Sequence, residues 1–177
     1  MKRNGLLDRR RGGTAPTAPT DGSQGEDVFE CLRGLALGTT PERLGLSLPA
    51  DEAVVYGVVM DWAVGNGVAT TVAFSTGDAS LYFSSGGGII GGGGHEGVGV
   101  AARRLVEEAQ SCLGKAAKSD STPLPGKGEV RFYLLANTGV FLGEGRTADL
   151  EGGLSEWSGV FDRANGVITE IRRTAEG

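Results

Sequence analysis

Three apolar segments joined by very short turns constrain the fold of this chain more than any other feature. Residues 53–62, 68–75 and 79–84 alternate large apolar side chains with small or polar ones, which is the period of a β-strand. The turns at 65–67 and 77–78 combine glycine with Asn or Asp, the residues that tight turns favour. Because such short turns cannot hold a crossover helix, the three strands are expected to form an antiparallel meander.

The first of these strands predicts which side chains share a face of the sheet. One face is expected to carry Val54, Tyr56, Val58, Met60 and Trp62. Gly57 and Asp61 fall on the other face, which is expected to be the more open one. Asp61 interrupts an apolar strand, so it is either an exposed residue or a site carboxylate, and exposure is the favoured interpretation.

Two amphipathic helices are expected to cover this sheet. The segment after His95 has an apolar stripe with steps of four and three residues, formed by Val98, Ala102, Leu105, Ala109 and Cys112. The last element, at about 154–173, places on one helix face Trp157, Val160, Phe161, Ala164, Ile168 and Ile171. Asn165-Gly166 could break this helix, because a glycine inside a helix costs about 1 kcal/mol relative to alanine.

A second hairpin is expected between these two helices. Its strands are predicted at 129–136 and 139–143, around a turn that contains Asn137 and Gly139. The glycine-rich stretch 143–153 that follows is expected to be a mobile loop. The chain therefore holds five predicted strands.

A first helix is expected to begin at Glu26 or Asp27. Its apolar stripe is predicted to be Val28, Cys31, Leu32 and Leu35. Residues 1–25 have no apolar periodicity and are small and polar, so we expect a disordered basic tail followed by one domain at 26–177. The order helix, three strands, helix, two strands, helix predicts an α+β fold with a five-stranded antiparallel sheet and flanking helices.

The distribution of charge limits which partners the chain can have. Residues 1–13 contain five basic side chains and one acidic one, whereas the whole chain has a net charge of −5. The acidic domain would repel phosphates, so contact with nucleic acid or an anionic membrane is expected only through the tail.

The location of the protein is predicted from what the sequence contains. No apolar run suits a membrane span or a secretory signal, and Cys31 and Cys112 fit free thiols, so the protein is expected to be cytoplasmic. The excess of arginine over lysine suggests a bacterial source.

A glycine-rich loop is the most distinctive motif of the chain. Seven of the nine residues at 86–94 are glycine, and Gly86, Gly88 and Gly91 match the pattern GxGxxG between a strand and a helix. Loop amides at a helix N-terminus can hold a small anionic ligand, although the meander before the loop argues against a dinucleotide fold. The alternative is a sharp connection, or a close backbone approach between subunits, where only glycine fits.

His95 and Glu96 follow this loop and complete the tentative ligand site. His95 is the single histidine, and Ser84 and Ser85 are near it in sequence, but no GxSxG nucleophile elbow is present. A polar residue that closes the first turn of a helix is the simpler interpretation of His95. The motifs HExxH and CxxC are absent, so no metal and no cofactor are expected.

Two strings of the chain resemble a known group of sequences. SSGGGIIGGGGHE at 84–96 and VRFYLLANTGVF at 130–141 resemble a family of uncharacterised bacterial proteins, over most of residues 53–173. The resemblance implies no activity. The order of the elements is also similar to that of profilin-like or roadblock-like domains, a similarity of fold that does not imply a function.

The absence of a convincing catalytic set favours a non-catalytic binding or regulatory domain that forms a homo-oligomer. Trp62 and Trp157 suit either the core or such an interface. The alternative is binding or turnover of a small anionic ligand at residues 86–94 with His95 and Glu96. A third hypothesis is an interaction module that the basic tail tethers to nucleic acid or membrane.

Overall fold

The structure is a computed structural model that describes residues 22–91 and 94–175. Its helices are α1 (Gly22–Leu37), α2 (Glu96–Cys112), α3 (Thr147–Glu151) and α4 (Ser158–Ala175), with short 3-10 turns at Glu42–Leu44 and Leu113–Lys115. Its strands are β1 (Val55–Val64), β2 (Gly67–Phe74), β3 (Ala79–Phe83), β4 (Gly88–Ile89), β5 (Ala117–Lys118), β6 (Glu129–Ala136) and β7 (Gly139–Arg146). None of the helices in these ranges has the length and apolar character needed to cross a membrane.

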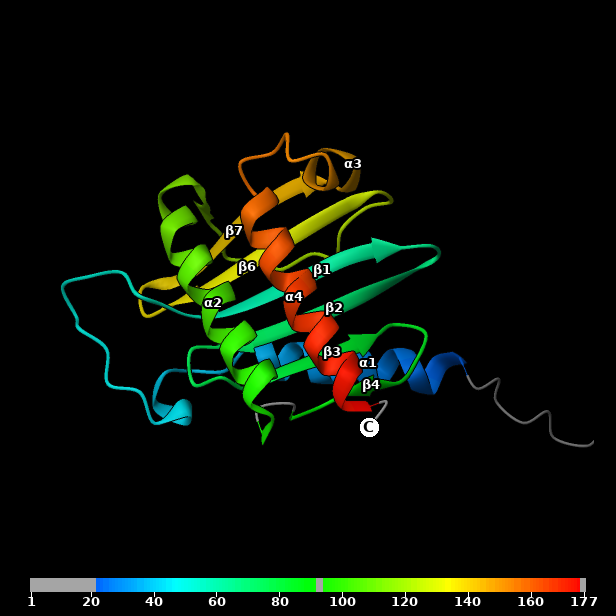
Figure 1. The fold of residues 1–177 in the computed structure, drawn as a ribbon, viewed down its shortest axis with the longest axis horizontal. Coiled ribbons are helices and arrows are strands. Elements are labelled where there is room, and N and C mark those ends of the chain that lie inside the picture. The colour runs from blue at the N-terminus through cyan, green and yellow to red at the C-terminus, as the bar shows by residue number, and fades with distance from the viewer. Residues whose placement is uncertain (1–21, 92–93, 176–177) are drawn as a thin grey trace, which may run out of the picture.

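All strands belong to one antiparallel sheet with the order β4-β3-β2-β1-β6-β7-β5 (Figure 1). The predicted α+β class and the antiparallel meander of the first three strands are confirmed. The predicted number of five strands is wrong, because the sheet formed by the described residues has seven. The two additional strands, β4 and β5, are two residues long, and a segment of that length has no detectable period.

The predicted faces of β1 are partly wrong because the strand contains an irregularity. The pairing of β1 with β6 shifts register between Val55 and Gly57. Such a bulge changes the alternation of side chains, since one extra residue is inserted into the strand. Val58 and Met60 therefore lie in one core cluster, whereas Tyr56 lies in the cluster on the other face of the sheet.

Helices α2 and α4 lie next to each other across one face of the sheet (Figure 1). Every residue of the two predicted stripes is buried, so both stripes are confirmed. Asn165 and Gly166 do not break α4, which is continuous to Ala175. The tryptophan that precedes α4, Trp157, stacks on Phe132 of β6 with ring centroids 5.6 Å apart. This apolar layer holds α4 in place on the sheet.

Helix α1 covers the opposite face of the sheet with a side that the sequence did not predict. Phe29, Arg33 and Ala36 are buried, whereas Val28 and Leu35 are 58% and 57% exposed. The predicted stripe on α1 is therefore wrong at Val28, Cys31 and Leu35, whereas Leu32 is half-buried and packs against the core. The helix begins at Gly22, four residues before the expected start at Glu26, and the rest of the predicted tail, residues 1–21, lies outside the described residues.

The predicted loop at 143–153 is also wrong. Strand β7 continues to Arg146, and helix α3 occupies the next five residues. Two of the glycines that suggested a loop allow close packing instead. A Cβ atom on Gly143 would lie 2.2 Å from the ring of Trp157, and one on Gly145 would lie 3.1 Å from Leu150.

Candidate functional site

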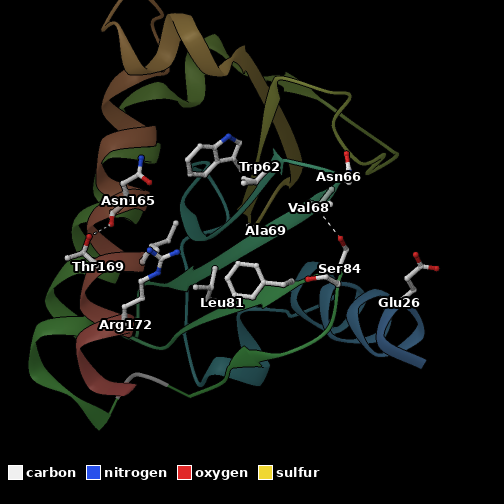
Figure 2. Close-up of a pocket in the computed structure, with 15 residues that line it drawn as sticks. Glu26, Trp62, Asn66, Val68, Ala69, Leu81, Ser84, Asn165, Thr169 and Arg172 are labelled. Carbon is white, nitrogen blue, oxygen red and sulfur yellow. Dashed lines mark hydrogen bonds between the residues drawn. The ribbon is translucent and has the colours of Figure 1, made fainter. Parts of the chain in front are cut away.

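A cleft of about 760 Å³ opens between α4 and three strands of the sheet (Figure 2). The end of β1, the start of β2 and the end of β3 form one wall, and a flank of α4 forms the other. Pockets of roughly 300–1,000 Å³ are typical of small-molecule sites in proteins. The cleft therefore has the size of a ligand site.

The inner surface of the cleft is apolar. Leu81 and Ile168 are almost completely buried beside it, and Ala69 is the small residue between Trp62 and Phe83 in the sheet register. These side chains line the cleft because the face of the sheet that packs under α2 and α4 extends past the side of α4. An apolar surface of this kind favours an apolar ligand, since burial contributes roughly 25 cal/mol for each Å² removed from water.

The indole of Trp62 is held in one orientation at the end of the cleft. Its Nε1 donates a hydrogen bond to Oγ1 of Thr147, at 3.2 Å. The ring meets Phe161 of α4 edge to face, with centroids 5.2 Å apart. These two contacts, with Thr147 and Phe161, hold the half-buried indole in place. The ring therefore offers a fixed apolar surface to the cleft.

Three polar residues of α4 line the other wall. Asn165, Thr169 and Arg172 are four and three residues apart, so they share one flank of the helix (Figure 2). The Thr169 hydroxyl donates to the backbone oxygen of Asn165, at 2.9 Å. The Asn165 amide and the Arg172 guanidinium form no hydrogen bond with another described side chain, and both face the cleft in Figure 2.

The rim opposite α4 comes from the β1–β2 turn, the end of β3 and the start of α1. The Ser84 Oγ accepts a hydrogen bond from the backbone nitrogen of Val68, at 2.8 Å, and ties these strands together. A Cβ atom on Gly67 would lie 2.8 Å from the same Oγ, so the close approach requires glycine there. Glu26 of α1 adds an exposed carboxylate to this rim.

The two rims of the cleft carry charges of opposite sign. Arg172 is the basic residue of the α4 rim, and Glu26 is the acidic residue of the other. The adjacent Arg173 forms an ion pair with Glu170 at 2.6 Å, whereas Arg172 has no ion-pair partner among the described residues. The lining residues include no histidine or cysteine, and the described residues contain no group of three or more His, Cys, Asp or Glu that could hold a metal ion.

The described residues of the predicted glycine site do not line this cleft, although Gly86 directly follows Ser85, which does. Gly86 belongs to the turn between β3 and β4, and Gly88 is the first residue of β4. Both have a positive φ, and a Cβ on Gly88 would lie 2.4 Å from the Leu81 oxygen. The Gly86 amide donates to the Phe83 oxygen at 2.9 Å, and the Gly91 amide contacts Ser80 Oγ at 3.4 Å. These two amides already have partners in the chain.

Gly91 differs from Gly88 in what surrounds it. A Cβ on Gly91 would meet no atom within 4 Å, although its φ of +76° still favours glycine. Gly88 therefore makes a close backbone approach within the chain, whereas the expected approach between subunits stays a prediction. Residues 92 and 93 lie outside the described residues, and an anion site in this loop stays a prediction.

His95 and Glu96 are both exposed at the start of α2. His95 is the N-cap residue, but its side chain makes no capping hydrogen bond, so the expected closure of the first turn by this side chain is wrong. Glu96 lines a separate hollow between α2 and α4, together with Arg104 and Arg163. The structure thus brings neither residue to the cleft that Ser84 and Ser85 line.

Asp61 is fully buried, so its predicted exposure is wrong. Its Oδ2 accepts hydrogen bonds from Nε and Nη2 of Arg33 on α1, at 2.8 and 2.6 Å, and its Oδ1 accepts one from Thr70 at 2.5 Å. Arg33 also donates to the Thr122 oxygen at 2.8 Å. A buried carboxylate with these partners holds α1 on the sheet, and its oxygens face α1, away from the cleft.

Tyr133 completes this polar cluster. Its ring lies beneath the Arg33 guanidinium, 5.5 Å from centroid to Cζ, and its hydroxyl donates to the Pro123 oxygen. Burial of the phenol raises the pKa of Tyr133, and the nearby Asp61 carboxylate raises it further, against smaller opposing effects of Arg33 and Arg131. The cluster is a structural one, closed by α1.

Comparison of the chain with protein-family models, with curated proteins and with solved structures gives no match. The resemblance to a bacterial family and the similarity to profilin-like or roadblock-like domains therefore stay predictions.

The sequence analysis missed the polar residues of the cleft. Asn165, Thr169 and Arg172 recur at helical spacing beside the apolar stripe of α4, which is the signal that could have found them. Arg172 precedes Arg173 near the end of the helix, where basic residues are common for reasons of the helix dipole alone.

Proposed function

We propose that this protein is a non-catalytic binding domain that holds a small, largely apolar molecule in the cleft between α4 and β1–β3. The cleft is the observation that supports this function most strongly. It has a volume of about 760 Å³, which suits a small molecule, and its inner surface is apolar. The residues that line it offer hydrogen bonds and one charge on each rim. They do not combine a nucleophile with a histidine base, the pairing on which the enzyme alternative depended.

Titration with the neutral fluorescent probe N-phenyl-1-naphthylamine tests this proposal. We expect saturable binding of one probe per chain, with an increase in probe fluorescence. Ala69→Leu fills the inner end of the cleft, and Thr169→Phe fills the same space from the exposed flank of α4, so each should abolish saturation. Thr138→Phe, in the β6–β7 turn, is the matched control with an added surface ring and should bind as the wild type does.

The proposed function is wrong if the wild-type protein shows no saturable binding. It is also wrong if Ala69→Leu and Thr169→Phe, both with the wild-type circular dichroism spectrum, still bind the probe with unchanged affinity. Two filling variants are used because Ala69 is buried and its replacement alone could disturb the fold.

We also propose that the protein forms a homo-oligomer through α1. Val28 and Leu35 are seven residues apart and project from the same side of α1, with more than half of each side chain exposed. A second copy of the helix can cover these two apolar side chains. Sedimentation velocity should show a dimer that Val28→Ser/Leu35→Ser converts to monomer, and that Leu154→Ser, at an exposed residue beyond α3, leaves intact. A wild-type monomer at every concentration would contradict this proposal.

The basic segment of the predicted tail is part of residues 1–21, outside the described residues. Its contact with nucleic acid or an anionic membrane, and the cytoplasmic location of the protein, stay predictions.

A further inference from the structure

We infer that the ligand of the cleft is an amphipathic organic acid, with its anionic group at Arg172 and its apolar body between Trp62 and Leu81. This inference rests on the proposed function. It goes further, because it states the chemical class of the ligand and the direction in which the ligand lies.

The anionic group is assigned to the α4 rim because Arg172 is a cation there without an ion-pair partner among the described residues. Its guanidinium extends from the last turns of α4 over the cleft (Figure 2). No described carboxylate lies within ion-pair distance, whereas Arg173, one residue on, is already paired with Glu170. A guanidinium has five N–H donors in a fixed fork, which matches the two oxygens of a carboxylate or two of a sulfonate.

Asn165 adds a neutral hydrogen-bonding group to the same rim. Its side-chain amide lines the cleft from α4, two turns before Arg172, and has no hydrogen-bond partner among the described side chains. The amide can donate through its NH₂ group. The α4 rim therefore offers donors to an anion at both of these positions.

The opposite rim excludes the anionic group. Glu26 contributes the carboxylate on that side, and a second negative charge near it would be repelled. The two rims together give the cleft a direction, with its positive side on α4 and its negative side at the start of α1. A ligand that spans the cleft therefore binds more favourably with its anionic group at the α4 rim.

The apolar body is assigned to the inner surface between the rims. The indole of Trp62 is fixed by its contacts with Thr147 and Phe161, and Leu81 continues the apolar surface along β3. A rigid aromatic surface of this kind suits a planar ring system or a packed hydrocarbon chain. Neither surface alone would select an organic acid, whereas the two together require a molecule with one apolar and one anionic part.

A matched pair of fluorescent probes tests the inference. 1-Anilinonaphthalene-8-sulfonate has the skeleton of N-phenyl-1-naphthylamine with one added sulfonate. We expect the wild-type protein to bind the sulfonate probe about three- to tenfold more tightly than the neutral one, a range between an exposed ion pair and a charge-assisted hydrogen bond. The preference should decrease as salt is added, because the ion pair is open to solvent.

Arg172→Gln should remove this preference and leave the affinity for the neutral probe unchanged. Arg173→Gln makes the same change of charge one residue away, outside the cleft, and should alter either affinity by less than about twofold. Glu26→Gln should act in the opposite direction and strengthen binding of the sulfonate probe. Glu26→Gln keeps the test valid if Arg172→Gln does not fold.

The outcomes separate this inference from the proposed function. Equal binding of the two probes by the wild-type protein, or equal effects of Arg172→Gln and Arg173→Gln, would overturn the inference while the binding function stands. Loss of both probes in Arg172→Gln would also overturn it, because Arg172 would then shape the cleft rather than select the charge. Failure of the wild-type protein to bind either probe would refute the proposed function itself.

Discussion

The two faces of the sheet are stabilised in different ways. The face under α2 and α4 packs mostly apolar side chains, with Leu105, Phe132 and Ile171 among those that are fully buried, and the described structure shows no buried ion pair on it. The face under α1 combines apolar side chains with the buried Arg33–Asp61 ion pair and the hydroxyl of Thr70. The comparison shows that a helix can be attached to a sheet by a polar cluster, where the apolar pattern of its sequence does not indicate which side is buried.

The physical difference lies in how each face responds to the loss of one partner. Removal of an apolar group leaves a cavity, and its cost depends on the volume lost. Removal of one member of a buried ion pair leaves a charge without a partner, which costs more than the pair itself contributes. Variants on the two faces should therefore differ in the size and even in the sign of their effects.

The largest effect is expected for Asp61→Ala. This variant leaves the buried Arg33 guanidinium without its carboxylate, so we expect a loss of about 3–5 kcal/mol in the free energy of unfolding, measured by urea denaturation. The double variant Arg33→Leu/Asp61→Leu removes both charges and should regain most of that loss. A double variant that is less stable than Asp61→Ala would contradict the interpretation of the polar cluster.

The second prediction tests which side of α1 contacts the sheet. Phe29→Ala should lower the free energy of unfolding by about 3–5 kcal/mol, because the ring is almost completely buried. Leu35→Ala, on the stripe that the sequence favoured, should change it by no more than about 0.5 kcal/mol in the monomer. Thermal melts at low protein concentration would measure both. The reverse order of the two effects would mean that the helix is rotated.

Two adjacent threonines of β2 compare the faces directly. Thr70 and Thr71 are both fully buried, but Thr70 donates to Asp61, whereas the Thr71 hydroxyl has no partner in the described structure. Thr70→Val should cost about 1.5–3 kcal/mol, the range for a hydrogen bond to a charged group. Thr71→Val should instead stabilise the protein by about 1 kcal/mol, because it removes an unpaired buried hydroxyl. Urea denaturation that shows the same sign for both would contradict this difference.

The smallest effect is expected from titration at high pH. The raised pKa of Tyr133 means that the folded protein keeps this phenol protonated at a pH where the unfolded chain has begun to lose the proton. Its contribution to stability is therefore complete below the ordinary tyrosine pKa of about 10 and is lost as the pH rises above it. Ultraviolet absorbance titration should show that Tyr133 loses its proton at a higher pH than an exposed tyrosine does. Asp61→Asn should make it ionise earlier, although burial, the larger cause, remains.

How much of the site could be predicted follows from where its residues lie in the chain. Trp62 and Leu81 occupy predicted strands, and Asn165, Thr169 and Arg172 occupy a predicted helix. No local pattern, however, places residues 62–84 beside residues 165–172, about a hundred positions apart. The motif that attracted the prediction, Gly86 to Glu96, proved to include a turn, an edge strand and a helix start whose described residues do not line the cleft.

The sequence alone determined the parts of this protein that depend on local interactions. The antiparallel meander and the stripes of α2 and α4 were predictable, because tight turns and apolar periodicity act over a few residues. Only the tertiary structure decided the buried side of α1, the state of Asp61 and the existence of the cleft. Asp61 can be buried because Arg33, 28 residues away, supplies the opposite charge, and no local sequence signal reports a stabilisation that arises only when distant segments meet.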